Sequence, residues 1–273
     1  MPMQAPTRPS RTSVRFALPS SLGPNAPQRA AQLESWLRDA LGRETEVVVA
    51  STYESLAREL LSGKVDAAWA PPFVCARIEA MGVRVLVRGL RNGASTYRAA
   101  LLCRADSKLT LETLKGSTAA WSDRDSVGGY LLPVAFLREH AMDPARTFSH
   151  QEFLGSYRAA LESVEKGSAA VTSVFAPSAK AGLGEVTGLE EVWPGKTAAF
   201  RALAFTDEAP NDGVAVSMSL AGGLVADLEK VLISMGQSEA GARVLKDCFN
   251  AEKFEVAPRM GYRALYRVAL ASL

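Results

Sequence analysis

Short apolar runs alternate with amphipathic helical segments along the N-terminal third of this sequence. Residues 14–18 and 46–50 have the composition of short strands, and residues 28–41 between them carry leucine, tryptophan and alanine at helical spacing. Residues 65–70 and 83–87 continue the pattern as further strands. Alternation of this kind places helices on the faces of a sheet. The sequence therefore predicts an α/β fold with a mainly parallel sheet.

The remainder of the chain adds more strand and helix patterns, together with a glycine-rich interval at residues 179–194 that is predicted to be irregular. The length of 273 residues allows one large domain or two of ordinary size. The further predicted strands are residues 97–104, 117–121, 168–174, 200–205 and 213–217. The further predicted helices are residues 156–166, 220–235, 238–249 and 262–271.

Composition excludes several classes of function. Hydrophobic residues make up 48% of the chain, charged residues 22%, and the net charge is +2, which favours folded cores and argues against nucleic-acid binding. No apolar run is long enough to cross a bilayer. Three scattered cysteines and two histidines suit neither a disulfide framework nor a zinc site. We therefore expect reduced thiols, no metal, no cofactor and no membrane-spanning segment.

Residues 1–13 are rich in proline, serine and arginine and contain no apolar core segment, so they do not resemble a secretory signal. We expect a disordered tail here. The expected compartment depends on the natural start of the chain. It is cytoplasmic if residue 1 is that start, and periplasmic if a signal was trimmed from the sequence.

Residues 121–130 read Trp-Ser-Asp-Arg-Asp-Ser-Val-Gly-Gly-Tyr and separate a predicted buried strand from a helical pattern. Ser126 is placed to cap that helix, and Gly128 and Gly129 lack the Cβ atoms that would keep a ligand away from the backbone. A helix N-terminus offers unpaired N–H groups and the positive end of a dipole, which suit a phosphate or a carboxylate. The alternative is a plain capped helix without a ligand. Pro133 must kink the first turn or move the helix start toward Gly129.

Several motifs occur in one order along the chain. They are Ser62-Gly-Lys-Val-Asp-Ala-Ala-Trp-Ala-Pro71, Leu111-Glu-Thr-Leu-Lys-Gly116, Asp125-Ser-Val-Gly-Gly-Tyr130 and Phe153-Leu-Gly-Ser-Tyr157. Their order and spacing, over roughly residues 14–212, resemble the phosphonate-binding family of ABC-transporter substrate-binding proteins. The resemblance implies a type II periplasmic-binding-protein fold, in which two Rossmann-like α/β lobes enclose a ligand cleft and are joined by two crossing segments. It implies that lobe one holds residues 1–95 plus 206–273, and that lobe two holds residues 96–205.

The resemblance also implies ligand contacts. Tyr53 and Tyr97 match two tyrosines that hold the anion in the family, and Ser126 matches the first position of the family's Ser-Thr-Ser-Gly turn. Thr206 and Asp212 lie near the last family contact, on the return crossing. These residues are therefore candidate ligand contacts.

Four positions depart from the family pattern. Val127 and Gly128 stand where the turn usually has Thr and Ser, so two hydroxyl donors are lost. Tyr157 stands where a histidine is usual, and Ala170 where an aspartate is usual. The amine subsite for an aminoalkyl phosphonate is therefore expected to be degraded, and we expect a small anion or an altered ligand instead of 2-aminoethylphosphonate. Val127, Gly128 and Tyr157 remain candidate ligand contacts.

The function that these observations favour is a non-catalytic solute-binding protein. It would hold a small oxyanion, such as a phosphonate, phosphate or phosphite, in the interlobe cleft for ABC-type uptake. One alternative is a cytosolic enzyme on the same fold, of the menaquinone-precursor type, with Asp66, Asp123 and Asp125 as acid/base candidates that more readily cap turns or face solvent. Another is a cytosolic ligand sensor. The expected partners are a small anionic ligand and an ABC permease, and we expect a monomer.

Overall fold

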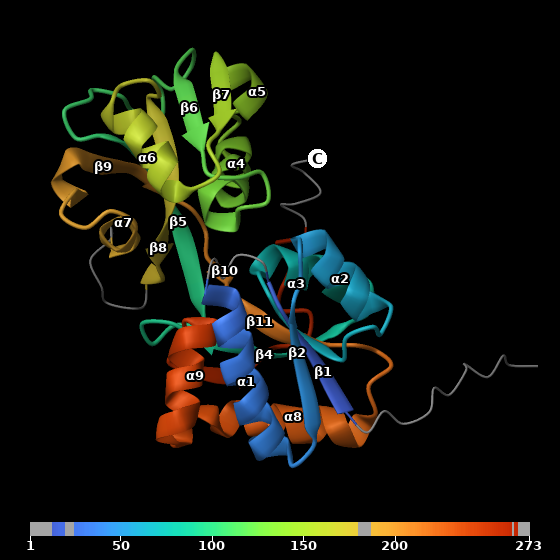
Figure 1. Cartoon of the computed structure of the whole chain (residues 1–273). Coiled ribbons are helices and arrows are strands. Elements are labelled where there is room, and N and C mark those ends of the chain that lie inside the picture. Colours follow the sequence, from blue (N-terminus) through green and yellow to red (C-terminus); the bar gives the residue numbers. More distant parts are fainter. Residues whose placement is uncertain (1–12, 20–24, 180–186, 264, 267–273) are drawn as a thin grey trace, which may run out of the picture.

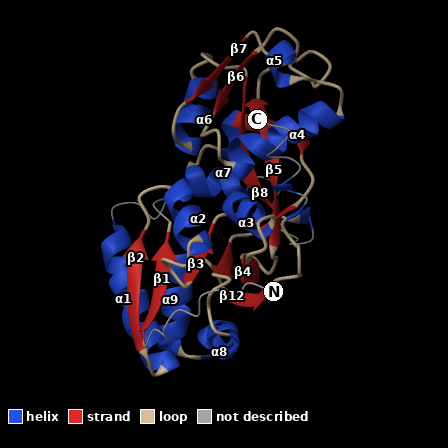
Figure 2. Cartoon of the chain, turned by 90° about the vertical axis from the view of Figure 1, so that its right-hand side faces the viewer, coloured by secondary structure: helices blue, strands red, loops and turns tan. Residues whose placement is uncertain are grey.

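The structure is a computed structural model that describes residues 13–19, 25–179, 187–263 and 265–266. Its strands form two six-stranded sheets, each flanked by helices, so the chain makes two α/β lobes (Figures 1 and 2). The predicted α/β class with two Rossmann-like lobes is confirmed.

Lobe one is built on the sheet with the strand order β12-β4-β11-β3-β1-β2. Its strands are β1 (Ser13–Leu18), β2 (Glu44–Val49), β3 (Ala67–Ala70), β4 (Arg84–Leu90), β11 (Gly213–Val216) and β12 (Lys253–Val256). Its helices are α1 (Ala26–Leu41), α2 (Tyr53–Leu61), α3 (Pro72–Glu79), α8 (Gly222–Ser234) and α9 (Glu239–Phe249).

Lobe two is built on the sheet with the strand order β10-β5-β8-β6-β7, in which β9 also pairs with β5. Its strands are β5 (Thr96–Arg104), β6 (Thr118–Trp121), β7 (His150–Phe153), β8 (Val171–Pro177), β9 (Phe200–Phe205) and β10 (Ala209–Pro210). Its helices are the π-helical turn η2 (Val127–Leu131), α4 (Leu132–Glu139), α5 (Pro144–Thr147), α6 (Tyr157–Glu165) and α7 (Thr187–Val192).

Both sheets mix parallel and antiparallel strands, so the prediction of a mainly parallel sheet is wrong. β1 is parallel to β2 and β3, and β6 is parallel to β7 and β8, as strand–helix alternation requires. However, β11 is antiparallel to β3 and β4, and β5 is antiparallel to β8 and β9. The reason is that β5 and β11 each follow a crossing from the other lobe and enter their sheet from the opposite end.

Local signals set the helix boundaries. Helix α1 has a proline in its first turn and ends at Gly42, whose φ of 60° is the left-handed conformation that glycine adopts without strain. Its buried face includes Leu33 and Leu37. Helix α2 begins at a capping box, in which Ser55 N–H donates to Thr52 Oγ1 and Thr52 N–H donates to Ser55 Oγ, both at 3.0 Å.

The main departures from the predicted elements are short segments. Helix α7 lies inside the interval 179–194 that was predicted to be irregular, while residues 180–186 fall outside the described part of the chain. Strand β12, with four residues, is too short for a periodic signal. Ser13 already belongs to β1, and the rest of the predicted tail lies outside the described residues, as does most of the helix predicted at 262–271.

Two crossings connect the lobes: residues 91–95 between β4 and β5, and residues 206–212 between β9 and β11 (Figure 1). They lie side by side, since Asn211 Nδ2 donates to the carbonyl oxygens of Gly89 and Ala94 at 2.9 and 3.0 Å. Strand β10 lies within the second crossing and pairs with β5. The lobe boundaries after residues 95 and 205 stay a prediction. They agree with the sheets to which the flanking strands belong, since β4 and β11 are in the sheet of lobe one and β5 and β9 are in the sheet of lobe two.

The core of lobe two is anchored at the end of β6. The side chain of Trp121, the last residue of β6, is 0% exposed. Its ring meets those of Tyr130 and Phe148 edge-to-face, each at 5.7 Å between centroids, and its Nε1 donates to Gln151 Oε1 at 3.0 Å. This packing holds the strand end from which the turn containing Ser126 leaves the sheet.

Candidate ligand-binding site

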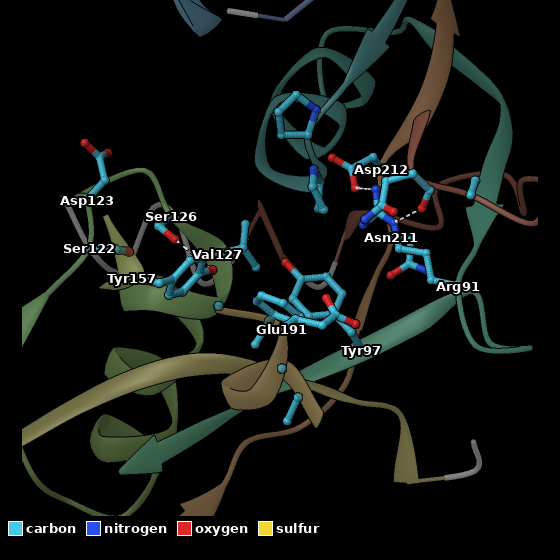
Figure 3. Close-up of a pocket in the computed structure, with 18 of the residues that line it drawn as sticks. Arg91, Tyr97, Ser122, Asp123, Ser126, Val127, Tyr157, Glu191, Asn211 and Asp212 are labelled. Atoms are coloured by element: carbon cyan, nitrogen blue, oxygen red, sulfur yellow. Dashed lines mark hydrogen bonds and ion pairs between the residues drawn. The ribbon is translucent and has the colours of Figure 1, made fainter. Parts of the chain in front are cut away.

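A cleft of about 1340 Å³ lies between the lobes and is lined by residues of both (Figure 3). Four of its walls directly follow the carboxyl ends of parallel strands: residues 51–54 after β2, 71–72 after β3, 122–128 after β6 and 155–157 after β7. Ligand sites in α/β sheets lie at such strand ends. The cleft is therefore a candidate ligand site.

The turn after β6 is a capped helix start, as predicted. Ser126 Oγ accepts a hydrogen bond from Gly129 N–H at 3.1 Å, and the Ser126 carbonyl accepts from Tyr130 and Leu131 N–H, both at 3.0 Å. The amides of Val127 and Gly128 precede these first intrahelical bonds, so they have no partner within the helix. Because η2 continues directly into α4, the helix dipole extends over residues 127–139.

Pro133 explains why the π turn does not continue. In a continued π pattern, residue 133 would donate to the Gly128 carbonyl, but proline has no N–H. That carbonyl instead accepts from Ser173 Oγ on β8 at 2.9 Å. The Gly128 carbonyl, which has no donor at residue 133, therefore accepts its hydrogen bond from a side chain of β8.

Glycines at 128 and 129 allow neighbouring side chains to approach the turn closely. A Cβ at Gly128 would lie 3.0 Å from the Tyr157 hydroxyl, and a Cβ at Gly129 would lie 1.9 Å from Ser122 Oγ. The two glycines were expected to let a ligand approach the backbone closely. Part of that space is occupied by the side chains of Tyr157 and Ser122. Three hydroxyls gather around the start of η2, those of Ser122, Ser126 and Tyr157 (Figure 3).

Tyr157 faces the turn from the start of α6. Ser126 Oγ donates to its hydroxyl at 3.2 Å, and its ring packs edge-to-face on Phe175, with 5.6 Å between centroids. The cap of α6, Ser156, accepts from Ala159 N–H at 3.1 Å and fixes the helix that carries Tyr157. Burial raises the pKa of Tyr157 to about 12, so its phenol stays a neutral donor near pH 7.

Tyr97 is a second buried phenol in the cleft. It lies on β5 at the first crossing, and burial, followed by the nearby Tyr157 and Asp212, raises its pKa well above the usual value. Tyr53 lines the cleft from lobe one, as the first residue of α2 after its Thr52 cap. Hydroxyl donors from both lobes thus line the cleft.

Among the described residues, the charged side chains of the cleft do not favour an anion. Arg91 and Lys246 are the cations that line it among the described residues, and Arg91 is bound to Asp212 at 2.6 Å. Arg91 also donates to the carbonyls of Phe249 and Asn250 at 3.2 and 2.8 Å, so it is committed to the crossings and the end of α9. The carboxylates that line the cleft in the described part of the chain are Glu54, Asp123, Asp125, Glu191, Asp212 and Glu252.

Backbone dipoles supply positive potential that the described side chains of the cleft do not. Helices α2, η2–α4 and α6 all begin at the cleft wall, at Tyr53, Val127 and Tyr157. Each helix N-terminus carries about half a positive charge. An anion in this cleft is therefore favoured near the helix starts and disfavoured beside the carboxylates.

Seven of the eight predicted contact residues line the cleft: Tyr53, Tyr97, Ser126, Val127, Gly128, Tyr157 and Asp212. Their role as ligand contacts stays a prediction. Thr206 does not line the cleft. Its Oγ1 accepts from Ala99 N–H and donates to the Asp207 carbonyl, both at 2.9 Å, so it fastens the second crossing to β5.

The inference drawn from Ala170 does not hold. This residue lies just before β8, at the end of the strand away from the cleft, so the carboxylate missing there says nothing about the cleft. Glu191 on α7 and Asp212 bring carboxylates into the cleft instead (Figure 3). Glu191 was missed because it lies in the interval predicted to be irregular. Ser122 was missed too, although a polar residue directly after a buried strand is a signal in an α/β sheet.

None of the helices in the described residues is long and apolar enough to cross a membrane.

Solved structures share this fold over nearly the whole chain. XAC2383 from Xanthomonas citri, bound to ATP, is 19% identical with a TM-score of 0.80, and the match covers 96% of this chain and 98% of that chain. A binding protein component of an ABC phosphonate transporter from Pseudomonas aeruginosa is 19% identical, with a TM-score of 0.71 and coverage of 95% and 86%. PhnD1 from Prochlorococcus marinus, in complex with methylphosphonate, is 15% identical, with a TM-score of 0.73 and coverage of 96% and 99%. At these identities the likeness establishes the fold alone.

A family model described as "ABC transporter, phosphonate, periplasmic substrate-binding protein" matches residues 16–262. The match includes both lobes and both crossings, and it extends beyond residue 212, where the motifs stop, through α8, α9 and β12. The chain belongs to the substrate-binding proteins of ABC phosphonate transporters.

Proposed function

We propose that this protein binds a small oxyanion, of the phosphonate, phosphate or phosphite type, in the interlobe cleft and delivers it to an ABC permease without chemical change. The observation that carries the proposal is the site at the start of η2. There the amides of Val127 and Gly128, which have no partner within the helix, belong to the turn that Ser126 ties to the hydroxyl of Tyr157, and this hydroxyl remains protonated near pH 7.

The position of the anion follows from the balance of charges in the cleft. Hydrogen bonds to a charged group contribute about 1.5–3 kcal/mol each, and helix termini add to them. We therefore expect the oxyanion at the starts of η2 and α6, with Tyr53 and Tyr97 as donors from the other walls. Because Glu191 and Asp212 are negatively charged, the part of the ligand that lies beside them is expected to be neutral or cationic.

Two of the three acid/base candidates of the enzyme alternative, Asp66 and Asp123, have structural roles. Asp66 Oδ2 accepts from Arg15 N–H at 2.8 Å, and Asp66 does not line the cleft. Asp123 Oδ1 accepts from Asp125 N–H at 2.8 Å and so closes the loop before Ser126. These contacts support binding over catalysis. A sensor would use the same cleft, and stimulation of the permease ATPase by the loaded protein distinguishes transport from sensing.

A thermal-shift panel tests the proposed function. The ligands are methylphosphonate, phosphate, phosphite, sulfate, 2-aminoethylphosphonate and, because one structural relative is bound to ATP, ATP itself. A ligand at 100 times its dissociation constant adds about 2.7 kcal/mol to the free energy of unfolding, which raises the melting temperature by about 5 °C or more. We expect at least one small oxyanion to do so. Stabilisation by ATP alone, or by no member of the panel, would contradict the proposal.

Tyr157→His is expected to make binding depend on pH. The wild-type phenol, with a pKa of about 12, stays protonated between pH 5 and 9 by a wide margin. A histidine has an ordinary pKa of about 6.5 and adds a charge-assisted hydrogen bond only when protonated. Affinity of the variant should therefore fall about tenfold as the pH rises from about 5.5 to 8, beyond any change seen for the wild type. Calorimetric titration with methylphosphonate at both pH values measures this difference, and parallel profiles for the two proteins would refute a contact at position 157.

A further inference from the structure

Ser122 is buried in the cleft wall, and its hydroxyl has no hydrogen-bond partner among the described residues. The residue is 3% exposed, follows β6 directly, and lies beside Ser126 in the cleft lining (Figure 3). Buried hydroxyls in native proteins are nearly always paired, because an unpaired one keeps the cost of its desolvation. The free hydroxyl of Ser122 therefore calls for an explanation.

The hydroxyl lies at the start of the helix. Ser122 Oγ and Ser126 Oγ are 1.9 and 2.7 Å from the point at which a Cβ on Gly129 would stand. Both oxygens therefore flank the same backbone atom in the first turn, whose amides at Val127 and Gly128 have no partner within the helix. The glycine at 129 creates the space that Ser122 Oγ occupies.

The hydrogens of the neighbouring hydroxyls are partly committed. Ser126 Oγ accepts from Gly129 N–H and donates its one proton to the Tyr157 hydroxyl. Ser126 thus has no proton left for a ligand while that bond exists. Tyr157 and Ser122 keep theirs, and these two donors stand on either side of Ser126.

We propose that Ser122 donates a hydrogen bond to the bound oxyanion, which its hydroxyl reaches by rotation about χ1. The Oγ is buried beside the Gly129 backbone, and Ser122 is one of the residues that line the cleft. Ser122 then supplies a donor from outside the turn, where Val127 and Gly128 carry no hydroxyl. This inference rests on the proposed function, since it assigns a contact within the same site.

Thr172 provides the matched control. Its Oγ1 is likewise buried and without a partner among the described residues, but Thr172 lies within β8 and does not line the cleft. Thr172→Val removes an unpaired hydroxyl of the same kind at a position where no ligand is proposed.

The test combines calorimetric titration of methylphosphonate with melting of the ligand-free protein. Ser122→Ala should weaken binding about tenfold or more. Its melting temperature without ligand should equal or exceed that of the wild type, because the variant removes a buried group that was unpaired. Thr172→Val should also keep or raise the melting temperature, and should bind as tightly as the wild type.

Other outcomes overturn the inference in recognisable ways. If Ser122→Ala binds as tightly as the wild type, Ser122 is not a ligand donor, while the proposed function stands. If Ser122→Ala loses ligand-free stability together with affinity, the hydroxyl supports the fold and the inference is wrong. If the wild type itself binds neither methylphosphonate nor any other oxyanion of the panel, the proposed function fails and this inference fails with it.

Discussion

Ser126→Ala is expected to weaken oxyanion binding by about ten- to a hundredfold, which corresponds to about 1.4–2.8 kcal/mol. The substitution removes the cap that holds Gly129 N–H at 3.1 Å, and it removes the hydroxyl that orients Tyr157 at 3.2 Å. Both changes loosen the donors around the unpaired amides of Val127 and Gly128. The turn would then have to be ordered by the ligand, at the expense of affinity.

Ser238→Ala separates the effect on binding from the effect on stability. Ser238 caps α9 in lobe one by accepting from Gly241 N–H at 3.1 Å, the same geometry as in the Ser126 cap, and it does not line the cleft. Each serine-to-alanine change should lower the free energy of unfolding by about 1 kcal/mol. Only Ser126→Ala should reduce affinity in calorimetric titration with methylphosphonate. Equal affinities of the two variants would mean that the turn is a structural cap and that the ligand lies elsewhere.

Features set by local chemistry could be predicted from the sequence. The Ser126 cap depends on an oxygen and an amide three residues apart, and the Thr52 cap of α2 has the same spacing, so both follow from residue type and order. Helix α1 and strands β1 to β3 follow from periodicity and from the glycine at 42. The resemblance to a family then placed seven of eight candidate residues in one cleft, because the order of the motifs reflects the fold.

Features set by distant parts of the chain could not be predicted in this way. The sheets are mixed because β5 and β11 enter from crossings, and the direction of entry leaves no mark in the hydrophobic pattern. The ion pair between Arg91 and Asp212 joins the two crossings. It neutralises a cation of the cleft, and residue composition does not reveal this pairing. The unpaired state of Ser122 depends on how closely Gly129 approaches it, which residue types do not specify.

Trp121→Ala is expected to lower the free energy of unfolding by about 3–5 kcal/mol, the range for deleting a buried aromatic side chain. The ring is 0% exposed and meets Tyr130 and Phe148 edge-to-face, so its removal leaves a cavity among aromatic neighbours that cannot close over it. The deletion also leaves Gln151 Oε1 without the Nε1 donor at 3.0 Å. Since the free energy of unfolding of folded domains is about 5–15 kcal/mol, this one substitution should remove a large part of it. Urea unfolding measures it.

The same substitution should reach the ligand site, because Trp121 supports both sides of the turn. Its ring packs against Tyr130, whose N–H donates to the Ser126 carbonyl at 3.0 Å, and its backbone leads directly into Ser122. Trp121→Phe keeps most of the packing but loses the bond to Gln151 and part of the buried ring, so it should cost about 1–3 kcal/mol, less than Trp121→Ala, and retain binding. Trp36→Ala, on the partly exposed side of α1, is the control for removing an indole far from the cleft and should cost less. If Trp121→Ala proves no more destabilising than Trp36→Ala, then the aromatic cluster does not hold the end of β6, and the turn must be positioned by its own hydrogen bonds.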